Sequence, residues 1–280
     1  MFSRVLFAEL FKAWCRFPLL FWGFLFIPIF SFAADLVLLS HPFRLPNAAP
    51  RVDLLFLLSH AMEISASPLA QVFFVAAAAV IFGTEYDSET WRLVATRARR
   101  VHWILAKVLL YAIGVFCSLT LVALGTTFCA ILDSINRFVP LVWEAHGGSA
   151  FAAFAAVFGI SWLELLLLGS VTGLVAVATR SVLVSAVTVI LIAFSQWILV
   201  LLVPLTTVAR GGASSTAILT SLPGLAANVG RFFITHAEVS PGLYIPAREA
   251  GIAVASLWGW IALTLALTLI WFHRQELSRE

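Results

Sequence analysis

The segment 82–107, FGTEYDSETWRLVATRARRVHWILAK, carries charged side chains between two long apolar runs. It holds five of the chain's seventeen Lys and Arg residues, together with acids at Glu85, Asp87 and Glu89. The chain contains no phosphate-binding GxxxxGKS/T sequence, no paired nucleophile and base, and no Cys or His spacing typical of a metal site. The chemistry that this segment indicates is therefore ionic contact with a partner rather than catalysis.

The order of charges in this segment predicts a short helix from Thr84 to Arg100. Thr84 and Asp87 have the spacing of a capping box, and the acids fall in the first turn, where the helix dipole favours them. Arg97 and Arg99 lie near the other end, where cations are favoured. Such a helix, held between two spans, could pass force from a cytoplasmic protein to the membrane. The alternative is a solvated basic loop that only fixes orientation.

Three polar side chains inside apolar runs could line a path for a substrate. Glu164 lies in the middle of the fourth run, where a charge costs about 2.5–3.5 kcal/mol and needs a partner or a wet cavity. It could serve substrate passage, or it could be a neutral carboxyl hydrogen-bonded between helices. Asp35 lies near the outer interface, and Gln196 is suited to bridging helices. Gly169 and Gly173 indicate close helix packing, within the chain or across a dimer.

The composition of the chain predicts that these residues are held in place by helices that cross a membrane. Hydrophobic residues make up 62% of the chain and charged residues 11%, whereas about a quarter of residues are charged in soluble proteins. Six apolar runs approach the roughly 20 residues that cross a hydrocarbon core as a helix, and they lack the alternation of a β-barrel strand. These runs are 17–39, 68–82, 103–124, 151–178, 182–202 and 252–272. We therefore predict an all-α integral membrane protein with six transmembrane helices, in one transmembrane domain over 1–280.

The segments between the runs differ in character. Two outer segments, 40–66 and 133–149, are expected to be a loop and a connector. The third, 204–248, contains two apolar pieces too short to span, on either side of Pro223-Gly224. Such pieces are typical of a re-entrant or surface-lying hairpin before the last span, and an ordinary covered loop is the alternative.

The distribution of basic residues predicts the orientation of the chain. With the N-terminus inside, eleven Lys and Arg fall in inward segments and six in outward ones, which favours cytoplasmic termini in the cell inner (plasma) membrane. The basic residues thus follow topology and do not indicate a nucleic-acid partner. Residues 1–16 place apolar side chains on one helical face and Arg4, Glu9 and Lys12 on the other, typical of an interfacial helix that binds membrane lipids. A cleaved signal peptide is the alternative reading of the first run.

The charged segment resembles the stretch around the coupling helix of ABC-2-type permeases, the transmembrane subunits of ATP-binding-cassette exporters. The matching positions are Glu85, Thr90, Leu93, Arg100 and Lys107. The resemblance extends along the chain to the amphipathic N-terminal helix, the six spans and the broken apolar segment before the last span. The chain departs from the family pattern at Glu89, where Gly is usual, and at Arg97-Ala98, where Pro is usual.

This resemblance implies that the segment 84–100 contacts a separate cytoplasmic ATPase subunit. The contact residues would be Thr84, Glu85, Asp87, Thr90, Leu93, Arg97 and Arg100. ATP and Mg²⁺ would be held by that subunit, while this chain would bind no cofactor and would not itself be an enzyme. A second permease copy, identical or different, would complete the transporter. The 24 Phe and 10 Trp residues favour export of an amphipathic or hydrophobic cargo. The alternatives are a secondary transporter, or a membrane assembly factor or anchor without ATP-driven transport.

Overall fold

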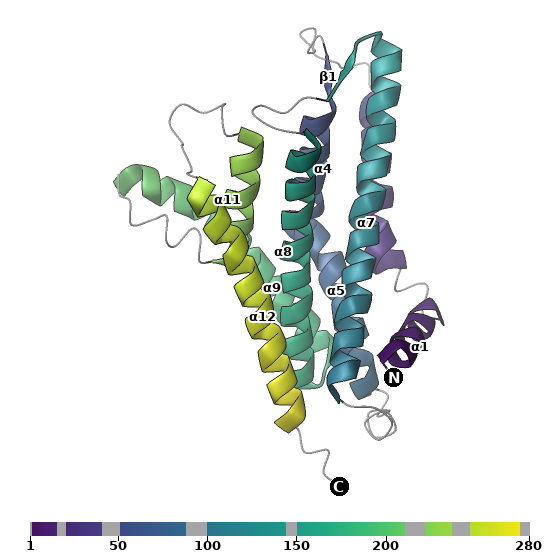
Figure 1. Ribbon diagram of the computed structural model, residues 1–280, viewed down its shortest axis with the longest axis vertical. Coiled ribbons are helices and arrows are strands. Elements are labelled where there is room, and N and C mark those ends of the chain that lie inside the picture. The colour runs from purple at the N-terminus through teal and green to yellow at the C-terminus, as the bar shows by residue number, and fades with distance from the viewer. Residues whose placement is uncertain are drawn as a thin grey trace.

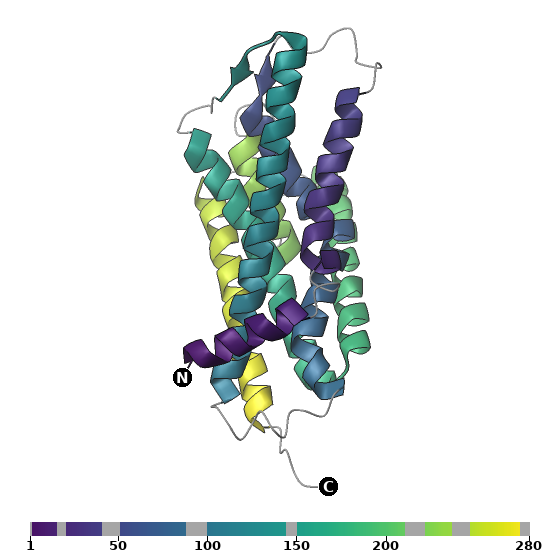
Figure 2. The ribbon, with the colours of Figure 1, turned by 90° about the vertical axis from the view of Figure 1, so that its right-hand side faces the viewer.

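Most of the helices run along one common axis, as Figure 1 shows, while α1 (Phe2–Cys15) lies across it (Figure 2). A computed structural model describes residues 2–15, 21–40, 51–87, 100–143, 150–210, 222–236 and 247–274. The elements are α1 (Phe2–Cys15), the π-helix η1 (Phe21–Leu25), α3 (Phe26–Ser40), β1 (Val52–Asp53), α4 (Leu54–Ser65), α5 (Pro68–Asp87), α7 (Arg100–Arg137), β2 (Leu141–Val142), α8 (Ala150–Thr179), α9 (Val182–Arg210), α11 (Pro223–His236) and α12 (Ala247–Arg274). The predicted all-α class is confirmed.

Five helices of the described chain are long and apolar enough to cross a membrane. Their spanning portions are Pro68–Tyr86, Val101–Arg137, Ala150–Thr179, Val182–Leu199 and Gly251–Arg274. They coincide with five of the six predicted apolar runs. The first run is helical from Phe21 to Ser40, but its apolar helix, Phe21–Val37, is shorter than the other five. Residues 17–20 of that run lie outside the described residues.

Several chain segments meet at one end of the helix bundle. Figures 1 and 2 show α1 and the C-terminal end of α12 at this end, with α1 lying across the bundle. The C-terminal end of α5 and the N-terminal end of α7 lie there too. The ends of α5 and α7 that flank residues 88–99 are thus at the same end of the bundle as α1 and the C-terminal end of α12.

The expected outer loop 40–66 contains a helix, α4, so that expectation is wrong for residues 54–65. Asp53 caps this helix, because its Oδ1 accepts a hydrogen bond from the Phe56 N–H at 3.1 Å. Its buried face includes Leu54, Leu58, Ala61 and Met62. The segment is too short to span a membrane, yet it forms a helix because its cap and its packing against the bundle stabilise it.

A break at Ala66 and Ser67 separates α4 from α5. Pro68 is the first residue of α5, where its missing N–H costs no helical hydrogen bond. Gln71 Nε2 donates to the Ala66 carbonyl oxygen at 2.7 Å, which gives a partner to a carbonyl at the end of α4. The break therefore brings a buried amide side chain, Gln71, to the junction of the two helices.

The expected connector 133–149 begins as helix, because α7 continues to Arg137. Phe138 then has a positive φ of 55°, a backbone conformation that ends the helix. Strand β2, Leu141–Val142, pairs in parallel with β1, Val52–Asp53. This short pairing joins the ends of α4 and α7 that lie far from α1 (Figure 1).

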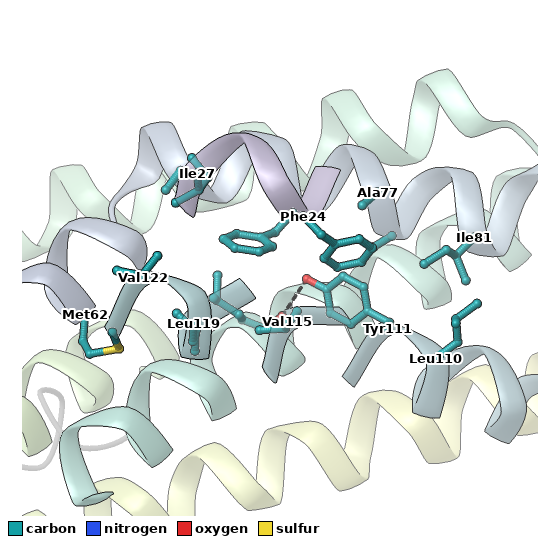
Figure 3. Close-up of a cluster of buried hydrophobic side chains, with 14 of the residues drawn as sticks. Phe24, Ile27, Met62, Ala77, Ile81, Leu110, Tyr111, Val115, Leu119 and Val122 are labelled. Atoms are coloured by element: carbon teal, nitrogen blue, oxygen red, sulfur yellow. Dashed lines mark hydrogen bonds between the residues drawn. The ribbon is translucent and has the colours of Figure 1, made fainter. Parts of the chain in front are cut away.

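The largest buried cluster joins η1, α3, α4, α5, α7 and α8, and part of it is drawn in Figure 3. Within it, the Tyr111 hydroxyl of α7 donates to the Leu165 carbonyl of α8 at 3.1 Å. The ring of Phe24 lies 5.9 Å from the Tyr111 ring, measured between centroids. Because Tyr111 is fully buried and hydrogen-bonded, it fixes the position of α7 against α8.

The predicted small-residue face of α8 packs within the chain. Gly169 lies against the Tyr111 ring, and Gly173 lies against an aromatic ring of α5. Between them, Ser170 Oγ lies 2.7 Å from Thr264 Oγ1 of α12. Small side chains let three neighbouring helices approach α8 closely, so this face serves packing inside the subunit.

Substituting Gly169 with Ala tests this packing. Gly169→Ala is expected to lower the free energy of unfolding by about 1–3 kcal/mol, because the new methyl group would overlap the fixed Tyr111 ring. Gly159→Ala is the matched control on the same helix. Nothing lies within 4 Å of its added Cβ, so a gain of about 0.5–1 kcal/mol in helix propensity is expected. Unfolding of both full-length variants in one detergent checks this, and equal effects would contradict it.

Candidate functional site

The residues predicted to contact an ATPase are divided between α5, α7 and a part of the chain that is not described. Thr84, Glu85 and Asp87 belong to the last turn of α5, and Arg100 is the first residue of α7. The predicted contact positions outside the described residues are Thr90, Leu93 and Arg97. The prediction that a separate helix begins at Thr84 is therefore wrong. A helix within 88–99 stays a prediction.

Helix α5 extends to Asp87, and Glu85 in its last turn is buried against neighbouring helices rather than exposed. A carboxylate near the C-terminal end of a helix is disfavoured by the helix dipole, and burial adds a desolvation cost. Two lysines, Lys12 of α1 and Lys107 of α7, offset both costs. An acid that the sequence assigns to the start of one helix thus lies at the end of another.

Four charged side chains from three helices form what we call the Lys107 cluster: Glu9 and Lys12 of α1, Glu85 of α5, and Lys107 of α7. Lys107 Nζ lies 3.3 Å from Glu85 Oε2 and 3.9 Å from Glu9 Oε2, and it donates to the Ile81 carbonyl. Lys12 Nζ lies 2.8 Å from Glu9 Oε1 and 2.9 Å from Glu85 Oε1. Two acids and two lysines compensate one another, which makes burial of the cluster possible.

Lys12 is the solvent-facing member of the Lys107 cluster, with 44% of its side chain exposed. Its Nζ lies 4.8 Å from the centre of the Trp103 ring. Burial alone lowers the pKa of Lys12, but hydrogen bonds to Glu85 and Glu9 raise this pKa above its ordinary value. Lys12 therefore stays charged at neutral pH, and the contact of α1 with α5 persists.

Helix α1 buries residues of both of its faces against the bundle. Glu9 belongs to the polar face of the pattern, yet it is buried, as is Val5 of the apolar face one turn earlier. The exposed side chains of α1 include Phe7, Leu10 and Phe11. An apolar outer face beside a buried ionic contact suits a helix lying at a membrane interface.

Glu9 and Lys107 are functional candidates that the sequence alone does not bring together. One signal in the sequence pointed to a hidden contact, because Lys107 stands inside an apolar run and a lysine there needs a partner. Its partners cannot be read from spacing, since Glu9 and Glu85 come from two other helices. Only the packing of α1 on α5 and α7 identifies them.

A second polar site surrounds a cavity of about 290 Å³ between the α4–α5 junction, α8, α9 and α11. Of the residues predicted to line a substrate path, Glu164 and Gln196 both line this cavity. Asp35 lies elsewhere: it accepts a hydrogen bond from Thr126 at 3.2 Å and lines a separate cavity of about 180 Å³. The structure thus brings two of the three residues together.

Glu164 is held at the cavity wall by partners from two other helices. Arg231 Nη1 of α11 lies 2.6 Å from Glu164 Oε2, and Gln71 Nε2 of α5 donates to Glu164 Oε1 at 3.0 Å. Arg231 also donates to the Ser161 hydroxyl and to the Asn228 side-chain oxygen. Glu164 is therefore bonded between helices by an ion pair and an amide hydrogen bond, and it also lines the cavity. Its role in substrate passage stays a prediction.

Arg231 reaches Glu164 because α11 folds back against α8, α9 and α12. Pro223 occupies the first position of α11, where proline is favoured, and small residues follow it. A Cβ on Gly230 would lie 2.9 Å from Ile160 of α8, so the helices are in close contact. An ordinary covered loop is therefore wrong for 223–236. Of the predicted 204–248 segment, residues 211–221 and 237–246 lie outside the described residues.

The helices and their buried polar contacts define the class of this chain, an all-α multi-pass membrane protein. No protein-family model matches the chain, and no curated protein matches it either. Its resemblance to ABC-2-type permeases therefore rests on the pattern of its sequence.

Proposed function

We propose that this chain is the membrane-spanning permease subunit of an ATP-binding-cassette exporter, driven by a separate cytoplasmic ATPase subunit. The observation that carries this proposal is the Lys107 cluster. It ties α1 to the end of α5 and the start of α7, the two helices that flank residues 88–99. A partner that moved 88–99 would therefore move three helices together rather than one flexible loop.

The six-span topology is part of this proposal. The spans are α3, α5, α7, α8, α9 and α12, with both termini and residues 88–99 in the cytoplasm. α1 lies at the cytoplasmic interface among lipids, and α11 is a re-entrant helix on the outer side. The positions of α1 and the end of α12 at one end of the bundle support this arrangement (Figure 2). We place the protein in the cell inner membrane, because its basic residues follow the positive-inside rule.

The cargo follows from the character of the helices. Most side chains facing neighbouring helices are apolar, and few described charges lie within the spans. We therefore assign an amphipathic or hydrophobic cargo that leaves the cell. A second permease copy completes the transporter, and ATP and Mg²⁺ bind the partner subunit.

Co-purification tests the proposal. Tagged full-length protein, extracted from its native membrane, is expected to retain an ATPase that carries a phosphate-binding loop. Arg97→Ala and Leu93→Ala are expected to lower the stimulated ATP turnover about tenfold, as truncated hot-spot residues of an interface do. Arg137→Ala is the matched control, because Arg137 lies at the opposite end of α7. Absence of such an ATPase, or unchanged turnover in the Arg97 variant, would refute the proposal.

A secondary transporter is the second candidate, favoured by the Glu164–Arg231 pair beside a cavity. Buried ionisable pairs of this kind occur in ion-coupled transporters. Collapse of the proton gradient while ATP is maintained separates the two. Loss of transport under that condition would favour the secondary transporter.

A further inference from the structure

We infer that the cavity beside Glu164 binds the positively charged head of an amphiphile, whose tail lies outside against α9. A role of this cavity in export rests on the proposed permease function. As a binding site it concerns this chain alone. Four observations carry it: the depth of the cavity, its volume, the charge of its walls and the side chains at its mouth.

The depth of the cavity places it in one half of the membrane. Helix α8 ends at Thr179, and Glu164 lies about 22 Å before that end at 1.5 Å per residue. A hydrocarbon core is about 30 Å thick. Measured from Thr179, the cavity therefore lies in the far half of the core, within reach of the headgroup region opposite to α1.

The volume of the cavity fits a headgroup but not a whole amphiphile. Pockets that enclose a drug-sized ligand span about 300–1,000 Å³. At about 290 Å³, this cavity holds a compact polar group with a few carbons. The rest of a longer molecule would have to leave through the mouth. That requirement selects a ligand with a small head and a separate tail.

The charged residues around the cavity favour a cation. Two carboxylates, Glu63 and Glu164, line it, against one guanidinium, that of Arg231. Arg231 forms an ion pair with Glu164 at 2.6 Å, so Glu63 supplies the excess negative charge of the cavity. Among the described residues, Glu63 pairs only with His60, at 4.0 Å, and both side chains are largely exposed. A cationic head would therefore meet a carboxylate still accessible to it.

The side chains at the mouth suit both parts of such a ligand. Trp197 lines the cavity and is 46% exposed, so its ring can receive a cation over its face. Along α9, Phe194 and Ile198 are also exposed and offer an apolar track for a tail. The wall toward α11 is tightly packed at Gln196, because a Cβ on Gly224 of α11 would lie 2.9 Å from Gln196 Oε1. We place the entrance beside Glu63 and Trp197, because both line the cavity and both are exposed.

Binding of matched probes to the full-length protein in maltoside micelles tests the inference. One probe is a pyrene-tailed alkyl trimethylammonium, and the other is the sulfonate with the same tail. Fluorescence anisotropy, with protein-free micelles as the blank, is expected to show about tenfold tighter binding of the ammonium probe. Glu63→Gln and Trp197→Leu are each expected to weaken it about three- to tenfold. Both positions are exposed, so these variants should unfold at the same temperature as the parent protein.

Asp133→Asn is the matched control, since it removes a carboxylate that lines the other cavity. It should leave the affinity for the ammonium probe unchanged. Equal binding of both probes, or unchanged affinity in the Glu63 and Trp197 variants, would overturn the inference. The binding assay contains no ATPase. Probe binding without an associated ATPase would refute only the proposed function, whereas an associated ATPase without probe binding would refute only this inference.

Discussion

Arg231→Gln is expected to lower the free energy of unfolding by about 3–5 kcal/mol, because it leaves the Glu164 carboxylate buried without its charged partner. Both side chains are less than a tenth exposed, so water reaches the lost contact only through the cavity that they line. Gln71 would remain as a donor to Glu164, but a single amide does not compensate a buried charge. Unfolding of the full-length protein in mixed micelles of maltoside and dodecyl sulfate measures the change.

Two further variants make this result specific to the buried pair. Glu164→Gln in the Arg231→Gln background removes the orphaned charge, so the double variant is expected to be more stable than Arg231→Gln alone. Arg137→Gln breaks the more exposed pair with Asp133 on α7, and less than about 1 kcal/mol should be lost. If Arg137→Gln and Arg231→Gln cost the same, the Glu164–Arg231 contact is not a buried ion pair.

Lys107→Met is expected to have a comparable effect on the opposite side of the molecule, again about 3–5 kcal/mol. Without Lys107, which is only 1% exposed, the buried acids Glu9 and Glu85 share Lys12 alone. Their repulsion should release α1 from α5 and α7. Faster amide hydrogen exchange in residues 2–15, together with the unfolding free energy, measures both consequences.

The controls for Lys107→Met come from the same cluster. Lys12→Met also leaves one lysine for the two acids, but water partly screens the 44% exposed Lys12, so a smaller loss than for Lys107→Met is expected. Glu85→Gln in the Lys107→Met background should recover part of the lost stability, because one of the two acids becomes neutral. Unchanged exchange in α1 of the Lys107 variant would show that the cluster does not hold this helix.

These two contacts also connect the proposed function with the fold. The Lys107 cluster lies at the end of the bundle near residues 88–99, while the Glu164–Arg231 pair lies in the far half beside a cavity. Helices α5 and α8, which carry Glu85 and Glu164, pack against each other. A movement of α5 at the end near residues 88–99 would therefore be transmitted to α8 and to the cavity at the other end of the bundle.

The positions of the long helices could be read from the sequence because membrane spanning is decided locally. A run such as 182–202 is apolar along its whole length, so its own backbone hydrogen bonds and side chains determine that it is a helix. The same applies to the small face at Gly169, whose packing role follows from residue size. The expectation of a loop is wrong for 54–65, because its cap and its packing against the bundle, which depend on the fold, stabilise a helix there.

The sequence by itself determined that this protein is a bundle of helices apolar enough to cross a membrane, and it indicated that Glu164 needs a partner or a wet cavity. Only the tertiary structure decided which residues pair with the buried charges. Arg231 pairs with Glu164, and Glu9 with Lys107. The two residues of each pair are far apart in the sequence, so helical spacing cannot predict these contacts. The physical reason is that a buried charge fixes only the need for an opposite charge nearby. Which residue supplies the opposite charge depends on how α1 and α11 pack against the bundle.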